Sequence, residues 1–138
     1  LEEVLKIFIS TSSHPLVLQT YSNLFHISLE NRDPARAFSY MKQALDYTPS
    51  QEYAFQAISI FLSIIRQLVQ RNQWEYLQHM TCVHSPQFED FNSLFTTIGY
   101  YAKYKFLKKE EFLKEYNNRR KELDQSAQKL LSQLLEEN

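Results

Sequence analysis

A row of polar side chains follows one face of the segment from Gln51 to Arg71, which is otherwise rich in apolar residues. The polar residues recur at steps of three or four, the spacing that places side chains on one face of an α-helix. They are Gln56, Ser59, Ser63, Arg66, Gln67 and Gln70. Amides and hydroxyls suit the backbone of an extended peptide, and the single guanidinium suits a carboxylate. The row predicts a peptide-binding surface, with an ordinary solvent-exposed helix face as the alternative.

Two other segments, Pro15–Asn31 and Gln87–Leu107, carry similar rows. The first row is Gln19, Ser22, Asn23 and His26, and the second is Asn92, Thr96, Tyr100 and Lys103. In stacks of helical hairpins the first helix of each hairpin lines the concave side, which is an extended binding surface. All three rows fall on the first helix of an expected hairpin. We therefore expect the three rows to line one groove.

Residue types that bind metals are grouped at one place. His79 and Cys82 share a helical face, and His84 lies just beyond them. A structural zinc site needs four ligands, and no second pair at a comparable spacing exists, so surface histidines beside a buried thiol are the preferred interpretation. The sequence has no Gly-rich loop and no nucleophile elbow. We expect no metal, no cofactor and no enzymatic activity.

The composition favours helices. The chain has one glycine in 138 residues, whereas β-hairpins and phosphate-binding loops need several. A net charge of −1, with basic residues that alternate with acidic ones, predicts no direct contact with nucleic acid. The absence of a long apolar stretch and the single cysteine predict no membrane contact and a cytoplasmic location.

The pattern predicts an all-α chain of about seven helices in one domain, residues 1–138. The expected helices are Glu2–Ser10, Pro15–Asn31, Pro34–Tyr47, Gln51–Arg71, Gln73–Val83, Gln87–Leu107 and Lys109–Glu137. Their short polar connections make neighbouring helices antiparallel. Because the chain begins with Leu inside a helical segment, we expect it to be part of a larger protein.

The stretch from Tyr21 to Pro49 resembles the tetratricopeptide repeat. It matches at Tyr21, Leu24, Ala37, Ala44 and Pro49, and it departs at Phe25, Ser28 and Met41. Asp33 and Pro34 between the two helices are suited to be the N-cap and the first helical residue. The resemblance implies a right-handed stack of antiparallel helical hairpins, in which Ala37 and Ala44 are buried between paired helices. An antiparallel bundle without repeats is the alternative.

The repeat recurs weakly further along the chain. Leu29, Arg32, Asp33 and Met41 have counterparts in Leu68, Arg71, Asn72 and Met80, each displaced by 39 residues. A standard tetratricopeptide repeat has about 34 residues, so we assign the excess to a longer first helix in the second unit.

The last expected helix carries a heptad-like row of apolar residues. The row is Tyr116, Leu123, Ala127, Leu130 and Leu134, and Leu131 and Leu135 widen it. It predicts a helix that either covers the end of the stack or forms a homodimer with a second copy.

The downstream half also resembles the C-terminal regulatory domain of Gram-positive peptide-sensing transcription regulators of the Rgg/MutR kind. The resembling segments are Phe55–Ile60, Arg71–Glu75, Phe88, Phe91 and Phe106–Leu107. The resemblance implies a cytoplasmic, usually dimeric helical domain that binds a short signalling peptide in a concave groove, normally after a helix-turn-helix domain. We expect a non-enzymatic regulatory module that binds a short peptide or protein partner. A structural scaffold or adaptor, and an enzyme fragment whose chemistry lies elsewhere, are the alternatives.

Overall fold

The computed structural model describes residues 1–10 and 14–135, and every regular element within them is helical. The α-helices are α1 (Glu2–Ser10), α2 (His14–Glu30), α3 (Pro34–Asp46), α4 (Gln51–Gln70), α5 (Trp74–Leu77), α6 (Glu89–Leu107), α7 (Glu110–Glu122) and α8 (Gln125–Leu135), and a 3₁₀ helix, η1 (Gln78–Cys82), follows α5. The prediction of an all-α chain is therefore confirmed. No helix of the described ranges is long and apolar enough to cross a bilayer.

The chain divides into two compact units, and the boundary between them falls within α4. Unit 1 is Leu1–Phe61 and unit 2 is Leu62–Asn138. The prediction that residues 1–138 form one domain remains a prediction.

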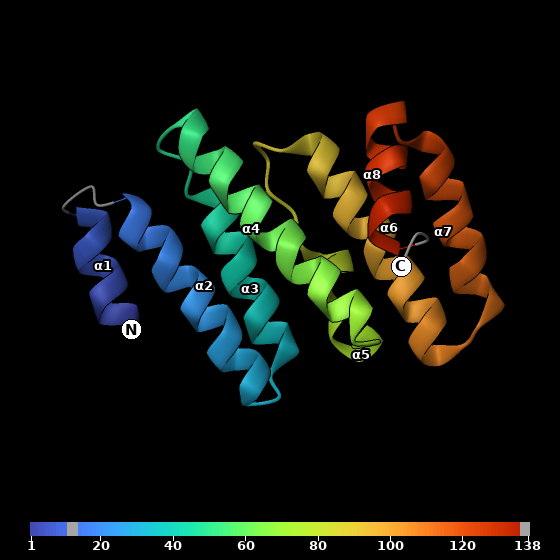
Figure 1. Cartoon of the computed structure of the whole chain (residues 1–138), viewed down its shortest axis with the longest axis horizontal. Coiled ribbons are helices and arrows are strands. Elements are labelled where there is room, and N and C mark those ends of the chain that lie inside the picture. The colour runs from blue at the N-terminus through green and yellow to red at the C-terminus, as the bar shows by residue number, and fades with distance from the viewer. Residues whose placement is uncertain (11–13, 136–138) are drawn as a thin grey trace. The chain divides into compact units, whose positions relative to one another are not determined.

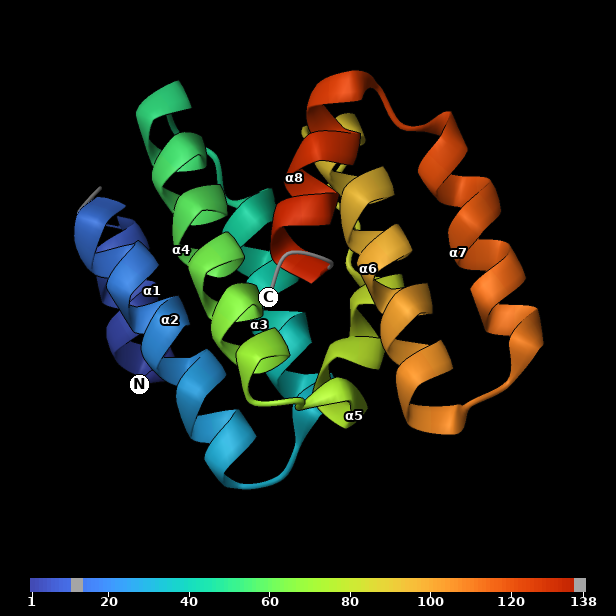
Figure 2. The same ribbon diagram turned by 45° about the vertical axis from the view of Figure 1, so that its right-hand side comes forward.

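The antiparallel pair α2 and α3 forms the centre of unit 1, as Figures 1 and 2 both show. Ala37 and Ala44 are fully buried, as predicted for small residues between paired helices. Phe25 is fully buried as well, and its ring meets Phe38 edge-on at 5.3 Å and Phe61 at 5.9 Å between centroids. A cluster of aromatic rings thus accommodates the bulky residue at a position that is small in tetratricopeptide repeats.

The turn between α2 and α3 is a Schellman turn. Arg32 has a left-handed backbone (φ 58°), and its N–H donates to the Leu29 carbonyl at 3.0 Å. The Asp33 N–H donates to the Ser28 carbonyl at 2.8 Å, which completes the motif. Asp33 then caps α3 by accepting from the Arg36 N–H at 3.2 Å, so the predicted N-cap is confirmed.

The same turn follows α4. Asn72 has φ 55°, its N–H donates to the Val69 carbonyl at 3.0 Å, and the Gln73 N–H donates to the Leu68 carbonyl at 2.9 Å. Each of these groups lies 40 residues after its counterpart in the first turn. The structural repeat is therefore displaced by 40 residues, one more than the displacement inferred from residue identities.

Unit 2 is built around α6, which contacts α5, η1, α7 and α8. Close contact with η1 depends on Gly99, because a Cβ at this position would lie 2.5 Å from the backbone nitrogen of Thr81. The predicted helix Gln73–Val83 is only partly correct. A four-residue α5 passes into η1, and Val83 is extended. With four residues, α5 is too short to be the second helix of a full hairpin.

The prediction of one helix over Lys109–Glu137 is wrong, because the chain breaks between α7 and α8. Leu123 adopts an extended conformation (φ −73°, ψ 150°), and the Asp124 carboxylate accepts from the Ala127 N–H at 2.7 Å. The Gln128 side-chain amide also donates to the Leu123 carbonyl, at 2.8 Å. These bonds start a new helix, so the apolar row from Tyr116 to Leu134 is divided between two helices.

Candidate functional site

The predicted polar row on α4 lies on the surface. Gln56 and Ser59 are exposed on the part of α4 in unit 1, and Ser63, Arg66 and Gln67 are exposed on the part in unit 2. Within the described part of the chain, the Arg66 guanidinium has no carboxylate within ion-pair distance. The row can therefore take part in recognition, although exposure alone does not distinguish it from an ordinary helix face.

The row on α2 is also accessible. Gln19, Asn23 and His26 are exposed, and Ser22 is half-buried. Because α2 belongs to unit 1 and α6 to unit 2, the prediction that three rows line one groove remains a prediction.

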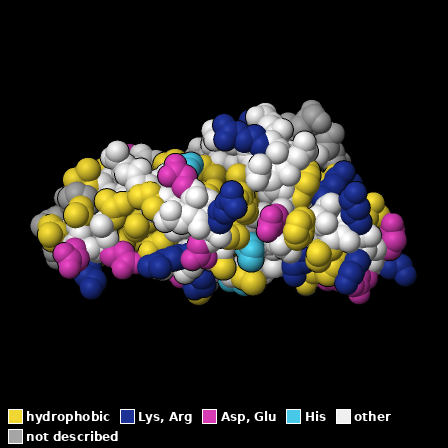
Figure 3. All heavy atoms as spheres, turned by 90° about the horizontal axis from the view of Figure 1, so that it is seen from below, with side chains coloured by type: hydrophobic (Ala, Val, Ile, Leu, Met, Phe, Trp, Pro, Cys, Tyr) yellow, Lys and Arg dark blue, Asp and Glu magenta, His cyan; other side chains and the backbone are white. Residues whose placement is uncertain are grey.

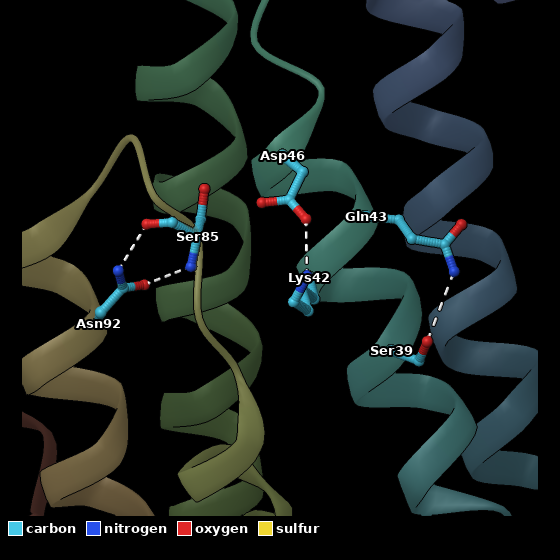
Figure 4. Close-up of polar contacts among 6 residues, drawn as sticks. All are labelled: Ser39, Lys42, Gln43, Asp46, Ser85 and Asn92. Atoms are coloured by element: carbon cyan, nitrogen blue, oxygen red, sulfur yellow. Dashed lines mark hydrogen bonds and ion pairs between the residues drawn. The ribbon is translucent and has the colours of Figure 1, made fainter.

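The row on α6 is engaged in contacts inside unit 2. Asn92 accepts from the Ser85 N–H at 2.6 Å and donates to the Ser85 carbonyl at 2.5 Å, so its amide holds the loop before α6 (Figure 4). Thr96 is 6% exposed. Tyr100 stacks on Phe112, and the Lys103 ammonium lies 5.3 Å from the Tyr100 ring centre. Within unit 2, Asn92 thus holds a loop and Thr96 is buried, whereas Tyr100 and Lys103 are half-buried beside α7; the role of this row in binding remains a prediction.

The residues considered for a metal site lie around η1. Cys82 is exposed, so the expectation of a buried thiol was wrong. The 3₁₀ helix ends at Cys82, and His84, two residues further on, is exposed as well. In the described ranges, no group of three or more His, Cys, Asp or Glu side chains could hold a metal ion.

The C-terminal apolar residues are covered within unit 2 to different degrees. Tyr116 of α7 is buried, and its ring meets that of Tyr101 edge-on with 4.9 Å between the ring centroids. Leu134 of α8 is fully buried. Leu123 is buried at the break, whereas Ala127 and Leu130 are half-buried. Helix α8 contacts α6, so part of this row covers the unit's own core; the two predicted roles, covering the end of a stack or forming a homodimer, remain predictions.

A cleft that the sequence did not predict lies in unit 1 between α1, α2 and α3. It has a volume of about 510 Å³, within the range of ligand-binding pockets. Its apolar lining consists of Leu1, Val4, Leu24 and Ile27, and its polar lining consists of Glu2, Glu3, Ser28, Asn31, Asp33, Arg36 and Tyr40. In Figure 3, hydrophobic side chains of unit 1 are visible on the left, bordered by acidic and basic ones.

Hydrogen bonds organise one side of this cleft. The Tyr40 hydroxyl donates to the Glu2 carboxylate at 2.5 Å and accepts from the Arg36 Nε–H at 3.3 Å. An Arg36 nitrogen also lies 3.6 Å from the same Glu2 oxygen. The hydrogen bond from Tyr40, and then the positive charge of Arg36, hold the pKa of Glu2 below its ordinary value. Glu2 is therefore ionised at neutral pH.

The side chains of the cleft leave an excess of negative charge. Glu2, Glu3 and Asp33 supply three carboxylates against the one guanidinium of Arg36. The apolar residues are only partly covered, with Val4 39% and Ile27 42% exposed. The cleft thus combines uncovered aliphatic surface with unbalanced carboxylates.

A sequence signal for this cleft did exist. The first helix reads Glu-Glu-Val-Leu-Lys-Ile-Phe-Ile, with apolar residues on more than one face. Leu5 is buried, whereas Val4 and Ile7 stay exposed, so one neighbouring helix does not cover all of the apolar surface of α1. A helix with apolar residues on more than one face indicates a second contact surface, besides the face that packs on the neighbouring helix.

Comparisons with protein-family models, with curated protein sequences and with solved structures found no match to this chain.

Proposed function

We propose that this chain is a non-enzymatic module that binds a short peptide or a segment of a protein partner, and that the cleft of unit 1 is its main binding site. The observation that carries the proposal is the combination of uncovered aliphatic side chains and excess carboxylates in one cleft of ligand-binding size. Peptide-binding grooves take apolar anchors from their ligands and use charge to select and orient them.

The cleft favours a particular kind of partner. Val4 and Ile27 remain partly in contact with water, so a ligand that covers them with an aliphatic side chain gains hydrophobic free energy. Glu3 is exposed and has no basic partner among the described residues, and it would attract a lysine or arginine. We therefore propose a segment with aliphatic anchors next to a basic residue.

Two pairs of variants test this proposal with peptides selected from a random display library. Ile27→Ser should weaken peptide binding by about 1 kcal/mol, since the peptide then removes less aliphatic surface from water. Leu16→Ser is the matched control, because Leu16 lies on the same helix, is 43% exposed and does not line the cleft.

The second pair tests the charge. Glu3→Lys should weaken binding by about 0.5–2 kcal/mol, an exposed ion pair being replaced by a repulsion. Glu52→Lys is its control, because Glu3 and Glu52 are both the second residue of their helix and Glu52 lies outside the cleft. Equal losses in each variant and its control, or selected peptides without basic residues, would refute the proposal.

The finer features of the module are also part of the proposal. Two Schellman turns displaced by 40 residues support a repeat architecture of tetratricopeptide type. The exposed row on α4, with Arg66 at its centre, would be a second contact surface that binds a ligand carboxylate. By resemblance, the module would serve as the effector domain of a cytoplasmic, dimeric transcription regulator.

A scaffold or adaptor is the second candidate. Phe55 is 78% and Ile7 is 58% exposed, and large exposed apolar side chains of this kind favour protein–protein contacts. A scaffold would depend on Phe55 and Ile7 rather than on Glu3. Variants Phe55→Ser and Glu3→Lys therefore distinguish the two functions in the same binding assay.

A further inference from the structure

The corner between α6 and α7 carries exposed apolar side chains within a cluster of lysines. Phe106 and Leu107, the last two residues of α6, are 44% and 43% exposed. The lysines around this pair are Lys103, Lys105, Lys108 and Lys109. Uncovered apolar surface and clustered positive charge thus occur together at one place in unit 2.

The turn itself fixes two of these lysines at the corner. Lys108 and Lys109 alone connect α6 to α7. Lys108 has a left-handed backbone (φ 56°), and its N–H donates to the Tyr104 carbonyl at 2.7 Å. The Phe112 N–H donates to the Lys109 carbonyl at 3.1 Å. Each lysine is therefore bonded to one of the two helices, and Figures 1 and 2 show the connection at the end of the α6–α7 pair.

The other two lysines lie on the last turns of α6. Lys103 is three residues before Phe106, so the two side chains share a helix face. The Lys103 ammonium lies 5.3 Å from the centre of the Tyr100 ring. The Lys105 ammonium lies 5.5 Å from the centre of the Tyr101 ring. An aromatic ring has no net charge, so these contacts position the ammonium groups without cancelling their charge.

Acidic residues at the corner do not balance the lysines. Glu110 and Glu111 follow directly, in the first turn of α7, where the positive end of the helix dipole attracts carboxylates. The ion pairs among the described residues include neither of these glutamates. Residues 103–111 contain four lysines and two glutamates, which leaves a net charge of +2.

The rest of unit 2 adds little negative charge near the corner. Glu89 and Asp90 begin α6 and Glu122 ends α7, so each is at the far end of its helix from the corner. Glu115 pairs with an arginine of the same helix at 2.8 Å. Of the other elements that contact α6, η1 and α8 carry no acidic residue within their described bounds, and α5 carries Glu75. The lysines still outnumber the glutamates when Glu75 is included.

We propose that this corner binds the surface of an anionic lipid bilayer. Phe106 and Leu107 insert among the head groups, and the four lysines contact the lipid phosphates and carboxylates. The strength of such binding depends on the apolar area buried and on the attraction of basic residues to anionic lipids. A long apolar stretch is needed to span a bilayer, and contact with its surface does not require one. This surface is independent of the cleft in unit 1 and goes beyond the proposed peptide binding.

Other polyanions match the corner less closely. Single-stranded nucleic acid is bound by several exposed rings on which successive bases stack. At this corner Phe106 is exposed, whereas Tyr100, Tyr101 and Tyr104 are half-buried. An acidic peptide with apolar anchors is bound in a groove, whereas Phe106 and Leu107 are at the end of a helix pair. A bilayer accepts a protruding end without a matching groove.

Cosedimentation with lipid vesicles tests the proposal. The chain is mixed at low ionic strength with vesicles of phosphatidylserine and phosphatidylcholine in equal parts, and separately with vesicles of phosphatidylcholine alone. We expect the chain to sediment with the anionic vesicles only, and added salt should weaken this binding. No binding to the anionic vesicles, or equal binding to both kinds, would overturn the proposal. Binding of a thymidine oligonucleotide or of polyglutamate, without binding to the vesicles, would assign the corner to another polyanion and would also overturn it.

A charge-matched pair of double variants tests the location. Lys108→Asn with Lys109→Gln should weaken vesicle binding by about fivefold for each lysine removed. Asparagine tolerates the left-handed backbone at position 108, so the turn should be retained. Lys121→Gln with Lys129→Gln removes the same charge from exposed positions at the other end of α7 and on α8. The control should bind nearly as well as the parent, and equal weakening by the two double variants would overturn the proposal.

A second pair tests the apolar contact. Phe106→Ser should weaken vesicle binding by about fivefold, since less apolar surface is then removed from water. Phe55→Ser removes a more exposed phenylalanine, 78% accessible on α4, and should leave vesicle binding unchanged. Equal binding by Phe106→Ser and the parent would overturn the insertion of the corner into the bilayer.

Discussion

Gly99 offers the sharpest test of the packing in unit 2. It is the only glycine of the chain, and it lies in the interior of α6, where glycine is ordinarily unfavourable. A Cβ at this position would lie 2.5 Å from both the backbone nitrogen and the Cγ2 of Thr81, and 3.1 Å from the carbonyl carbon of Met80. Gly99→Ala therefore has two opposite effects on stability: it raises helix propensity, and it introduces a steric clash with η1.

The two effects have comparable sizes. Alanine in place of glycine in a helix interior gains about 0.8–1 kcal/mol. Overpacking costs about 1–3 kcal/mol, and here the clash includes a backbone atom that cannot rotate away. We expect packing to dominate and the free energy of unfolding to fall by about 1–2 kcal/mol.

Equilibrium unfolding in urea measures this change. Ser93→Ala is the control, because Ser93 is exposed on α6 and its replacement should stabilise the helix slightly. Thr81→Ala in the Gly99→Ala background should recover part of the loss, since it removes the Cγ2 contact and leaves the backbone contact. A Gly99→Ala protein as stable as the parent would refute the close approach of α6 and η1.

Four further predictions concern two tyrosines of unit 1, the turn after α4 and the exposed polar row on α4. Tyr53→Phe should raise the free energy of unfolding by about 1 kcal/mol in urea denaturation, because the buried hydroxyl has no partner among the described residues. Tyr47→Phe should lower the free energy of unfolding by about 1 kcal/mol, because the Tyr47 hydroxyl and His14 Nδ1 are hydrogen-bonded at 2.7 Å. A Tyr47→Phe protein more stable than Tyr53→Phe would contradict the hydrogen bond of Tyr47 and the unpaired hydroxyl of Tyr53. Asn72→Ala should lower the thermal midpoint, since a left-handed residue other than Gly or Asn costs about 1–2 kcal/mol, whereas Asn72→Gly should not. Arg66→Ala should weaken binding of a carboxylate-bearing peptide by about 1.5–3 kcal/mol and leave the thermal midpoint unchanged; unaltered affinity in calorimetry would exclude Arg66 as an anchor.

Local chemistry made the first hairpin predictable. Asp33 and Pro34 define the start of α3 whatever surrounds them, because an aspartate cap and a proline at the first helical position act within one turn. Ala37 and Ala44 were predictable as buried because their spacing places both on one helix face.

The break at Leu123 could not be predicted from periodicity. The apolar spacing continues through Leu123 and Ala127, so a single helix satisfies the pattern equally well. The competing signal was Asp124, which caps a new helix three residues before Ala127. Contact of α8 with α6 favours the broken form, and such long-range contact is not visible in local spacing.

The candidate site was the least predictable feature. The rows on α2 and α4 were recognised as polar faces, and they are mainly exposed. Asn92 and Thr96 have the same spacing, but the loop at Ser85 and the core of unit 2 engage them. The cleft depends on which apolar residues of α1 and α2 remain uncovered, and tertiary packing decides this.

The most direct test of the central claim is an amide chemical-shift titration of the ¹⁵N-labelled chain with a peptide selected for binding. If the cleft of unit 1 is the binding site, the amides of Val4, Ile27 and Arg36 should shift together and saturate at one dissociation constant. The same titration of Ile27→Ser should saturate at higher peptide concentration. Shifts confined to Ser63 and Arg66 on α4, with the cleft unaffected, would contradict the account.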